Sequence, residues 1–102
     1  MALKIKWTEL AESSFNNIII YIESNFGESA SARYVKKVYS ILDQLAAFPS
    51  LGKLEKSNYS YRTIIIEKKT TLIFMVESDS ILLFKFFDNR LNPETKFESN
   101  NR

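Results

Sequence analysis

"ILLFKFFDNRLNP", residues 81–93, is the stretch that decides the fold. Residues 81–87 contain one polar side chain, Lys85, and the charged residues Asp88 and Arg90 follow directly. A strand with one face in a core and the other in water alternates apolar and polar residues. Because this strand is apolar on both faces, we predict a sheet whose two faces both need a cover.

Two more apolar segments precede it, "YRTIIIE" at residues 61–67 and "TLIFMVE" at residues 71–77. The connections "KKT" and "SDS" are short enough for hairpin turns, so the three segments predict an antiparallel meander. Strict alternation distributes its side chains over two apolar faces. One face receives Ile64, Ile66, Leu72, Phe74, Val76, Leu82, Phe84 and Phe86, and the other receives Ile65, Ile73, Met75, Ile81, Leu83 and Phe87.

The first half of the chain predicts a strand and two helices. "LKIKW", residues 3–7, alternates strictly, and its lysines favour a strand at a sheet edge because they discourage pairing with other chains. Thr8 is a good N-cap for the helix that follows, and Gly27 ends that helix. "FPSLG", residues 48–52, ends the second helix with proline and glycine. The apolar stripes are Ala11, Phe15, Ile18, Ile22 and Phe26 in the first helix and Val35, Val38, Leu42 and Leu45 in the second.

The predicted order is strand, helix, helix, strand, strand, strand. It gives an α+β domain over residues 1–90, in which a helical hairpin packs on one face of an antiparallel sheet. "KLEKSNYS", residues 53–60, is polar and is expected to be a loop, and the polar tail 91–102 is expected to be poorly ordered. Two helices of about 10 Å width fill only one face of the sheet. The other face requires the tail, a second copy of the chain or a separate partner.

The composition excludes several classes of function. The 102 residues include no cysteine and no histidine, which removes thiolate chemistry, the usual general base and the commonest metal ligand. We therefore expect no metal and no other cofactor. The apolar runs are far too short to span a membrane, and Met1 to Trp7 lacks the apolar core of a signal peptide, so we expect a cytoplasmic protein with no membrane partner.

Four strings in order resemble the RelE/ParE superfamily of toxins from bacterial type II toxin-antitoxin modules. They are "IKWTELAESSFNNIIIYIE", "LAAFPSLGK", "YRTIIIEKKTTLIFMV" and "ILLFKFFDNRLNPE", and together they extend over nearly the whole chain. The resemblance implies a cognate antitoxin that wraps over the toxin. We therefore assign antitoxin binding to Ile65, Ile73, Met75 and Leu83, which the helical hairpin leaves uncovered.

The resemblance implies two alternative activities: ParE-like members bind DNA gyrase, and RelE-like members cut messenger RNA on the ribosome. RNA cleavage needs cations on the phosphate and a proton acceptor and donor. Arg62 and Arg90 are the candidate catalytic residues, because the resemblance implies that basic residues at these two places face the active surface. The candidates for target or phosphate binding are Lys53, Lys56, Arg62, Lys85 and Arg90.

Two departures from the RelE pattern weigh against RNA cleavage. Thr71 stands where that pattern has an arginine before the third strand's apolar string, and no tyrosine or histidine follows Arg90 closely. The long helical hairpin is more similar to the ParE-like, plasmid-stabilisation branch. Three hypotheses follow: a toxin that poisons gyrase, a ribosome-dependent nuclease, and an inactive module that only binds antitoxin. A structural alternative for Arg90 is an ion pair with Asp88, and for Arg62 one with a carboxylate of the next strand.

Overall fold

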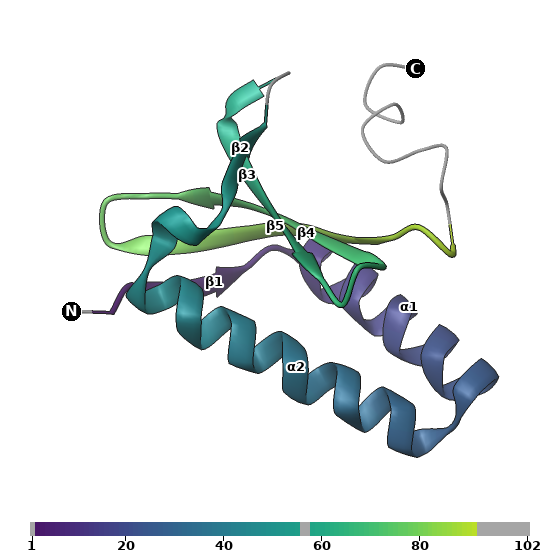
Figure 1. Cartoon of the computed structure of the whole chain (residues 1–102). Coiled ribbons are helices and arrows are strands. Elements are labelled where there is room, and N and C mark those ends of the chain that lie inside the picture. The colour runs from purple at the N-terminus through teal and green to yellow at the C-terminus, as the bar shows by residue number, and fades with distance from the viewer. Residues whose placement is uncertain (1, 56–57, 92–102) are drawn as a thin grey trace.

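The computed structural model describes residues 2–55 and 58–91. This part of the chain has two α-helices and a five-stranded sheet, and the helices pack against one face of the sheet (Figure 1). The α+β class and the helical hairpin are as predicted. The predicted tail 91–102, apart from Leu91, lies outside the described residues. The elements in order are β1 (Lys4–Trp7), α1 (Glu9–Phe26), α2 (Glu28–Ala47), a 3-10 turn η1 (Pro49–Leu51), β2 (Lys53–Glu55), β3 (Asn58–Ile66), β4 (Thr70–Val76) and β5 (Ser80–Asp88).

The strand order in the sheet is β1-β5-β4-β3-β2. Strands β2 to β5 pair antiparallel with their chain neighbours, which confirms the meander. Strand β1 lies at the sheet edge, as its lysines predicted, but it pairs in parallel with β5.

The prediction of a loop over residues 53–60 is wrong, because β2 and the start of β3 lie within this range. The short β2 has an exposed Leu54 and lacks the apolar alternation that reveals a strand.

Capping and apolar spacing define the two helices. The Thr8 Oγ1 accepts a hydrogen bond from the Ala11 N–H at 2.9 Å, which confirms the predicted N-cap. Gly27 has a φ of 96°, a conformation that glycine adopts without a Cβ penalty, and its N–H donates to the Glu23 carbonyl. The stripe of α1 is buried as far as Ile22, but Phe26 is 58% exposed, so its predicted place in the core is wrong.

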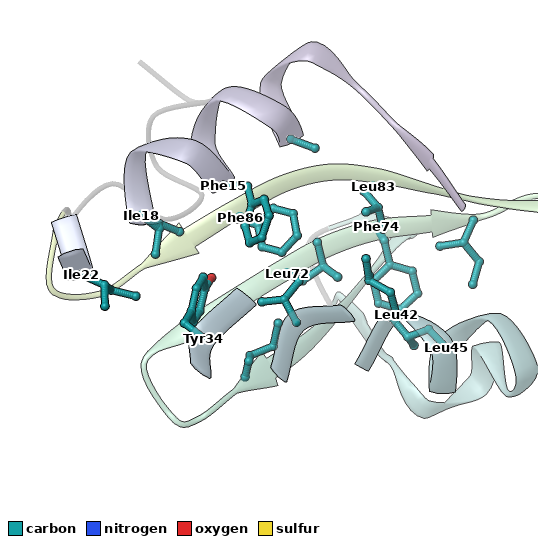
Figure 2. Close-up of a cluster of buried hydrophobic side chains, with 14 residues drawn as sticks. Phe15, Ile18, Ile22, Tyr34, Leu42, Leu45, Leu72, Phe74, Leu83 and Phe86 are labelled. Carbon is teal, nitrogen blue, oxygen red and sulfur yellow. The ribbon is translucent and has the colours of Figure 1, made fainter. Parts of the chain in front are cut away.

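The core lies between the helices and one face of the sheet (Figure 2). Phe15 from α1 and Phe86 from β5 pack with their ring centroids 4.9 Å apart, and Trp7 stacks on Phe86 at 5.5 Å. Aromatic pairs at such distances stabilise a core beyond the area that they bury. The first and last strands are therefore joined by side chains as well as by backbone hydrogen bonds.

A β-bulge in β5 changes which side chains face the helices. Ile73 pairs with Lys85, but the next residue, Phe74, pairs with Leu83, so Phe84 is an extra residue. Because of this insertion, Leu83 and Phe86 both face the helices and both belong to the core cluster. The prediction that strict alternation places Leu83 on the face away from the helices is therefore wrong.

Thr8 connects the bulge to the start of α1. Its hydroxyl lies 3.0 Å from the Leu83 carbonyl oxygen and 2.9 Å from that of Phe84, to which it donates, and it also accepts the Ala11 N–H. Beyond the end of β1 no strand pairs with this edge of β5. There the Ser14 Oγ accepts a hydrogen bond from the Phe86 N–H at 3.0 Å, a bond that a neighbouring strand would otherwise provide. Side chains of α1 thus satisfy the edge of β5 that β1 leaves unpaired.

We predict that Thr8→Ala lowers the free energy of unfolding by about 2 kcal/mol, because a lost N-cap costs about 1 kcal/mol and a lost hydrogen bond to part-buried carbonyls costs about as much again. Thr8→Ser keeps the hydroxyl and is expected to retain most of this stability. Urea denaturation measures both. The exposed Ser13→Ala is the control, and a Thr8→Ala protein no less stable than it would contradict this role.

Candidate functional site

The sheet face opposite the helices, here called the helix-free face, carries most of the residues that the sequence singled out. Directly paired residues of neighbouring strands lie on the same face of a sheet. The register therefore joins Lys53, Thr63, Ile73 and Lys85 in one row across β2, β3, β4 and β5. A row over four strands spans about 14 Å. The structure thus brings the two candidate lysines Lys53 and Lys85 to the two ends of one row.

The apolar side chains of this face are only partly exposed. Ile65 is 63% exposed and Met75 is half-buried, whereas Ile73 is 2% exposed. Of the four residues assigned to antitoxin binding, three lie on the helix-free face, and the fourth, Leu83, is buried against the helices. The ammonium of Lys85 lies 5.8 Å from the centre of the Phe87 ring, so this face combines apolar surface with positive charge.

Arg62 lies on the opposite face, because it pairs with the core residue Phe74. Its Nη1 donates to the Gly52 carbonyl at 3.1 Å. Gly52 is packed so closely that an added Cβ would lie 2.2 Å from the Phe74 ring. The guanidinium of Arg62 therefore holds the turn before β2 against the core. The structural alternative for Arg62 was an ion pair with a carboxylate of the next strand, whereas the bond in the structure is to a backbone carbonyl.

Arg90 lies beyond the end of β5 and binds Asp88, as the structural alternative proposed. Its Nε donates to Oδ1 at 2.9 Å, its Nη2 donates to Oδ2 at 2.6 Å, and its backbone N–H also donates to Oδ1. The guanidinium lies 5.3 Å from the centre of the Tyr21 ring and 5.8 Å from that of Phe26. Arg90 is thus held by a bidentate ion pair and lies over two aromatic rings of α1, which contact each other edge to face.

The Asp88 side chain is completely buried, and the Thr70 hydroxyl also donates to it. Burial by itself raises the pKa of a carboxyl, but the hydrogen bonds and the charge of Arg90 outweigh burial and lower the pKa of Asp88 below its ordinary value. The same hydrogen bonds raise the pKa of Arg90. Asp88 is therefore ionised whenever the protein is folded near neutral pH.

The candidate residues do not form one centre. Arg62 and Asp88 both lie on the helix side of the sheet. They are two strands apart, about 10 Å, and four residues apart along the strand direction, about 13 Å. Arg90 lies beyond Asp88. Lys53 and Lys85 lie on the helix-free face, and Lys56 lies outside the described residues. The structure thus separates the two candidate catalytic arginines from each other and from the two lysines.

Tyr34 is the residue whose position the sequence analysis did not anticipate. Its side chain is buried in the core at 3% exposure, and its hydroxyl has no hydrogen-bond partner among the described residues. Burial raises the pKa of this phenol well above its ordinary value, and the nearby Thr70 hydroxyl offsets part of the effect. The spacing of Ser31, Tyr34, Val38 and Leu42 along α2 is the signal that would have identified it as buried.

Metal binding and membrane insertion find no support in residues 2–55 and 58–91. No group of three acidic side chains there is arranged to hold a metal ion, and histidine and cysteine are absent from the sequence. In the same residues no helix combines the length and apolar character needed to cross a membrane.

Comparison with known proteins places the chain among toxins. The family model described as "ParE toxin of type II toxin-antitoxin system, parDE" matches residues 5–90. Among curated proteins none matches the sequence. A solved chain of the chromosomal ParDE TA system from P. aeruginosa is similar with a TM-score of 0.74 and 17% identity, and the match covers 85% of this chain and 96% of that chain.

Two further solved structures share the fold. The YoeB dimer from Staphylococcus aureus has a TM-score of 0.62 and 21% identity, with 83% of this chain and 94% of that chain covered. A conserved hypothetical protein from Helicobacter pylori has a TM-score of 0.59 and 14% identity, with 86% and 96% covered. At these identities the likeness establishes the fold and leaves the activity open.

The buried ion pair predicts a strong dependence of stability on Arg90. Arg90→Ala leaves the Asp88 carboxylate buried without its partner, which is expected to cost about 3 kcal/mol of unfolding free energy. Thermal or urea denaturation measures the loss, and the exposed Lys36→Ala is the control.

The same pair predicts a pH dependence. Because the pKa of Asp88 is lower in the folded than in the unfolded state, its stabilisation is complete above the unfolded pKa of about 4 and is lost as the pH falls through the folded value. The difference in stability between the wild type and Asp88→Asn is therefore expected to shrink below pH 4. The exposed Asp43→Asn serves as the control. A constant difference down to pH 2 would contradict the assignment.

Proposed function

Because the chain belongs to the ParE toxin family of type II toxin-antitoxin systems, we propose that it arrests bacterial growth by binding an essential target in the cytoplasm, and that a cognate antitoxin keeps it silent. DNA gyrase is the target that the ParE-like resemblance implies. The observation that supports binding over RNA cleavage is the separation of the candidate catalytic residues. Arg62 and Arg90 are each occupied by an intramolecular bond on the helix side of the sheet.

A nuclease would need several groups to act on one phosphate within a few ångströms. The helix-free face offers Lys53 and Lys85 at the ends of one row, with Thr63 and Ile73 between them. Among the described residues this face provides no histidine and no arginine beside the lysines. Two positive charges about 14 Å apart, separated by the half-buried Thr63 and the buried Ile73, favour docking of a macromolecule over catalysis at a single phosphate.

A ribosome-dependent nuclease remains the second candidate, because Lys53 and Lys85 lie on one face and can contact two separate phosphates of one RNA strand. The two activities differ in their first effect on the cell. Poisoned gyrase leaves broken DNA, whereas a nuclease leaves cut messages and intact DNA.

Expression of the chain alone in a bacterium is expected to arrest growth and to induce the DNA-damage response, with messages on ribosomes left intact. Message mapping and a DNA-damage reporter in the same culture measure both effects. Cut messages without DNA damage would replace the gyrase proposal by the nuclease. If the folded chain causes no arrest, it is an inactive module that has kept only antitoxin binding.

The helix-free face is the proposed antitoxin site. Its exposed Ile65 and half-buried Met75 provide apolar contacts, and β2 leaves an unpaired strand edge beside them. Extended segments commonly pair with such an edge. Of the residues first assigned, Leu83 no longer belongs to this proposal because it packs in the core, and Ile73, at 2% exposure, offers almost no surface of its own.

Ile65→Asp is expected to weaken binding of the antitoxin, taken as the product of the adjacent gene, by at least about tenfold, because it places a charge in an apolar interface. The matched control is Ile20→Asp. Ile20 is 60% exposed, close to the 63% of Ile65, but lies on α1, on the other side of the molecule. Calorimetry with purified proteins measures the affinities. Equal binding by both variants would place the antitoxin elsewhere.

A further inference from the structure

A cleft of about 270 Å³ opens at the tip of the helical hairpin, away from the helix-free face. It lies where the end of α1, the start of α2, the β3–β4 turn and the residues after β5 meet. Apolar side chains of Ile22, Phe26 and Ala30 line one part, and charged side chains of Arg33, Lys69 and Arg90 line another. This hairpin-tip cleft plays no part in the function proposed above.

The charges around the cleft are unbalanced. Arg90 is neutralised by Asp88, but Arg33 and Lys69 have no ion pair among the described residues. Glu67 is the one acidic side chain in the lining. Counting Asp88 behind Arg90, three positive charges face two negative charges. One bound monoanion would make the cluster neutral, whereas a dianion would leave an excess of negative charge.

An unsatisfied polar group lies in the lining of the cleft. The Tyr34 hydroxyl is buried, has no hydrogen-bond partner among the described residues, and is close enough to Asp88, Arg90 and Glu67 to interact with their charges. Its neighbour Thr70 donates its own hydroxyl hydrogen to Asp88. The neighbouring Thr70 hydroxyl lowers the pKa of this phenol only in part. A buried hydroxyl without a full hydrogen bond is costly, and a ligand that enters the cleft as far as Tyr34 would supply the missing acceptor.

The β3–β4 turn that holds Glu67 and Lys69 is strained. Glu67 has a φ of 54° and Lys68 a φ of 69°, values that favour glycine or asparagine, yet neither residue is present here. The Asn89 N–H donates to the Lys69 carbonyl at 3.0 Å, which fixes this turn beside Arg90. Backbone strain that is maintained by surrounding contacts is concentrated at binding sites.

We propose that the hairpin-tip cleft binds a carboxylate group, with Arg33 and Lys69 contacting its oxygens, the Tyr34 hydroxyl donating to it, and its apolar body lying on Phe26. The carboxylate has two possible sources: a free organic acid, or an Asp or Glu side chain of a bound protein. Both use the same contacts.

Phenylacetate is the probe, because it joins a carboxylate to an apolar ring. We expect it to shift the backbone amide NMR signals of Lys69 and Thr70 saturably in the purified full chain. Phenylacetamide, which has the same shape without the charge, is expected to bind at least about tenfold more weakly. Inorganic phosphate is expected to bind more weakly than phenylacetate near pH 8, where it is a dianion. Equal binding of the amide or of phosphate would overturn the proposal.

Variants test the assigned residues. The double variant Arg33→Gln and Lys69→Gln is expected to lose binding of phenylacetate, whereas Lys36→Gln with Lys37→Gln removes the same charge from exposed positions of α2 and is expected to keep it. Tyr34→Phe is expected to weaken binding about fivefold without lowering Tm, since only an unpartnered hydroxyl is lost. Unchanged binding by Tyr34→Phe, or equal losses in the two double variants, would refute the assignment.

A last measurement separates the two sources. If the product of the adjacent gene displaces phenylacetate, the natural carboxylate is a side chain of that protein. If both bind together, it is a free acid. Either outcome supports a carboxylate site, and the phenylacetate measurements are valid whether or not the chain poisons gyrase.

Discussion

The bulge at Phe84 in β5 is the constraint on which the arrangement of the molecule depends. Without the extra residue, strict alternation would place Leu83 and Phe86 on opposite faces of the sheet, so that only one of them could face the helices. With it, Phe86 joins the aromatic core and Asp88 is buried at the helix side, where a lone carboxylate would be unstable. Arg90 then has to follow within reach of Asp88, and its guanidinium lies over the paired rings of Tyr21 and Phe26 in α1. One inserted residue thus determines the core, the buried ion pair and the position of the hairpin-tip cleft.

The fold was predictable from the sequence where one physical signal dominated. Apolar spacing of three and four residues, with Thr8 and Gly27 at the ends, defined α1, and alternation defined the meander. The bulge left no comparable signal, because Phe84 and Phe86 are equally apolar and either could face the core. Strand β2 was missed because it is held by backbone pairing with β3, while Lys53 and Leu54 are exposed.

The functional residues were less predictable than the fold, because the type of a charged residue does not determine which groups its side chain contacts in the folded protein. Arg62 and Arg90 looked alike as basic residues at strand ends, yet one fastens a turn through the Gly52 carbonyl and the other neutralises Asp88. Lys53 and Lys85 are 32 positions apart in the sequence and come to the two ends of one row only through the register of three strand pairs. Tyr34 gave no sign in the sequence that its hydroxyl would be left without a partner.

The parallel pairing of β1 with β5 has a consequence for how the chain folds during synthesis. Thr8 bonds to carbonyls 75 and 76 positions later, so the sheet edge closes only after nearly all of the domain has left the ribosome. Contacts of such long sequence separation form slowly, because the intervening chain must first be ordered. Until then, Leu3, Ile5 and Trp7 have no strand to join and are exposed to pairing with other chains. Lys4 and Lys6, which alternate with these residues, oppose that pairing during the delay and so protect the nascent chain from aggregation.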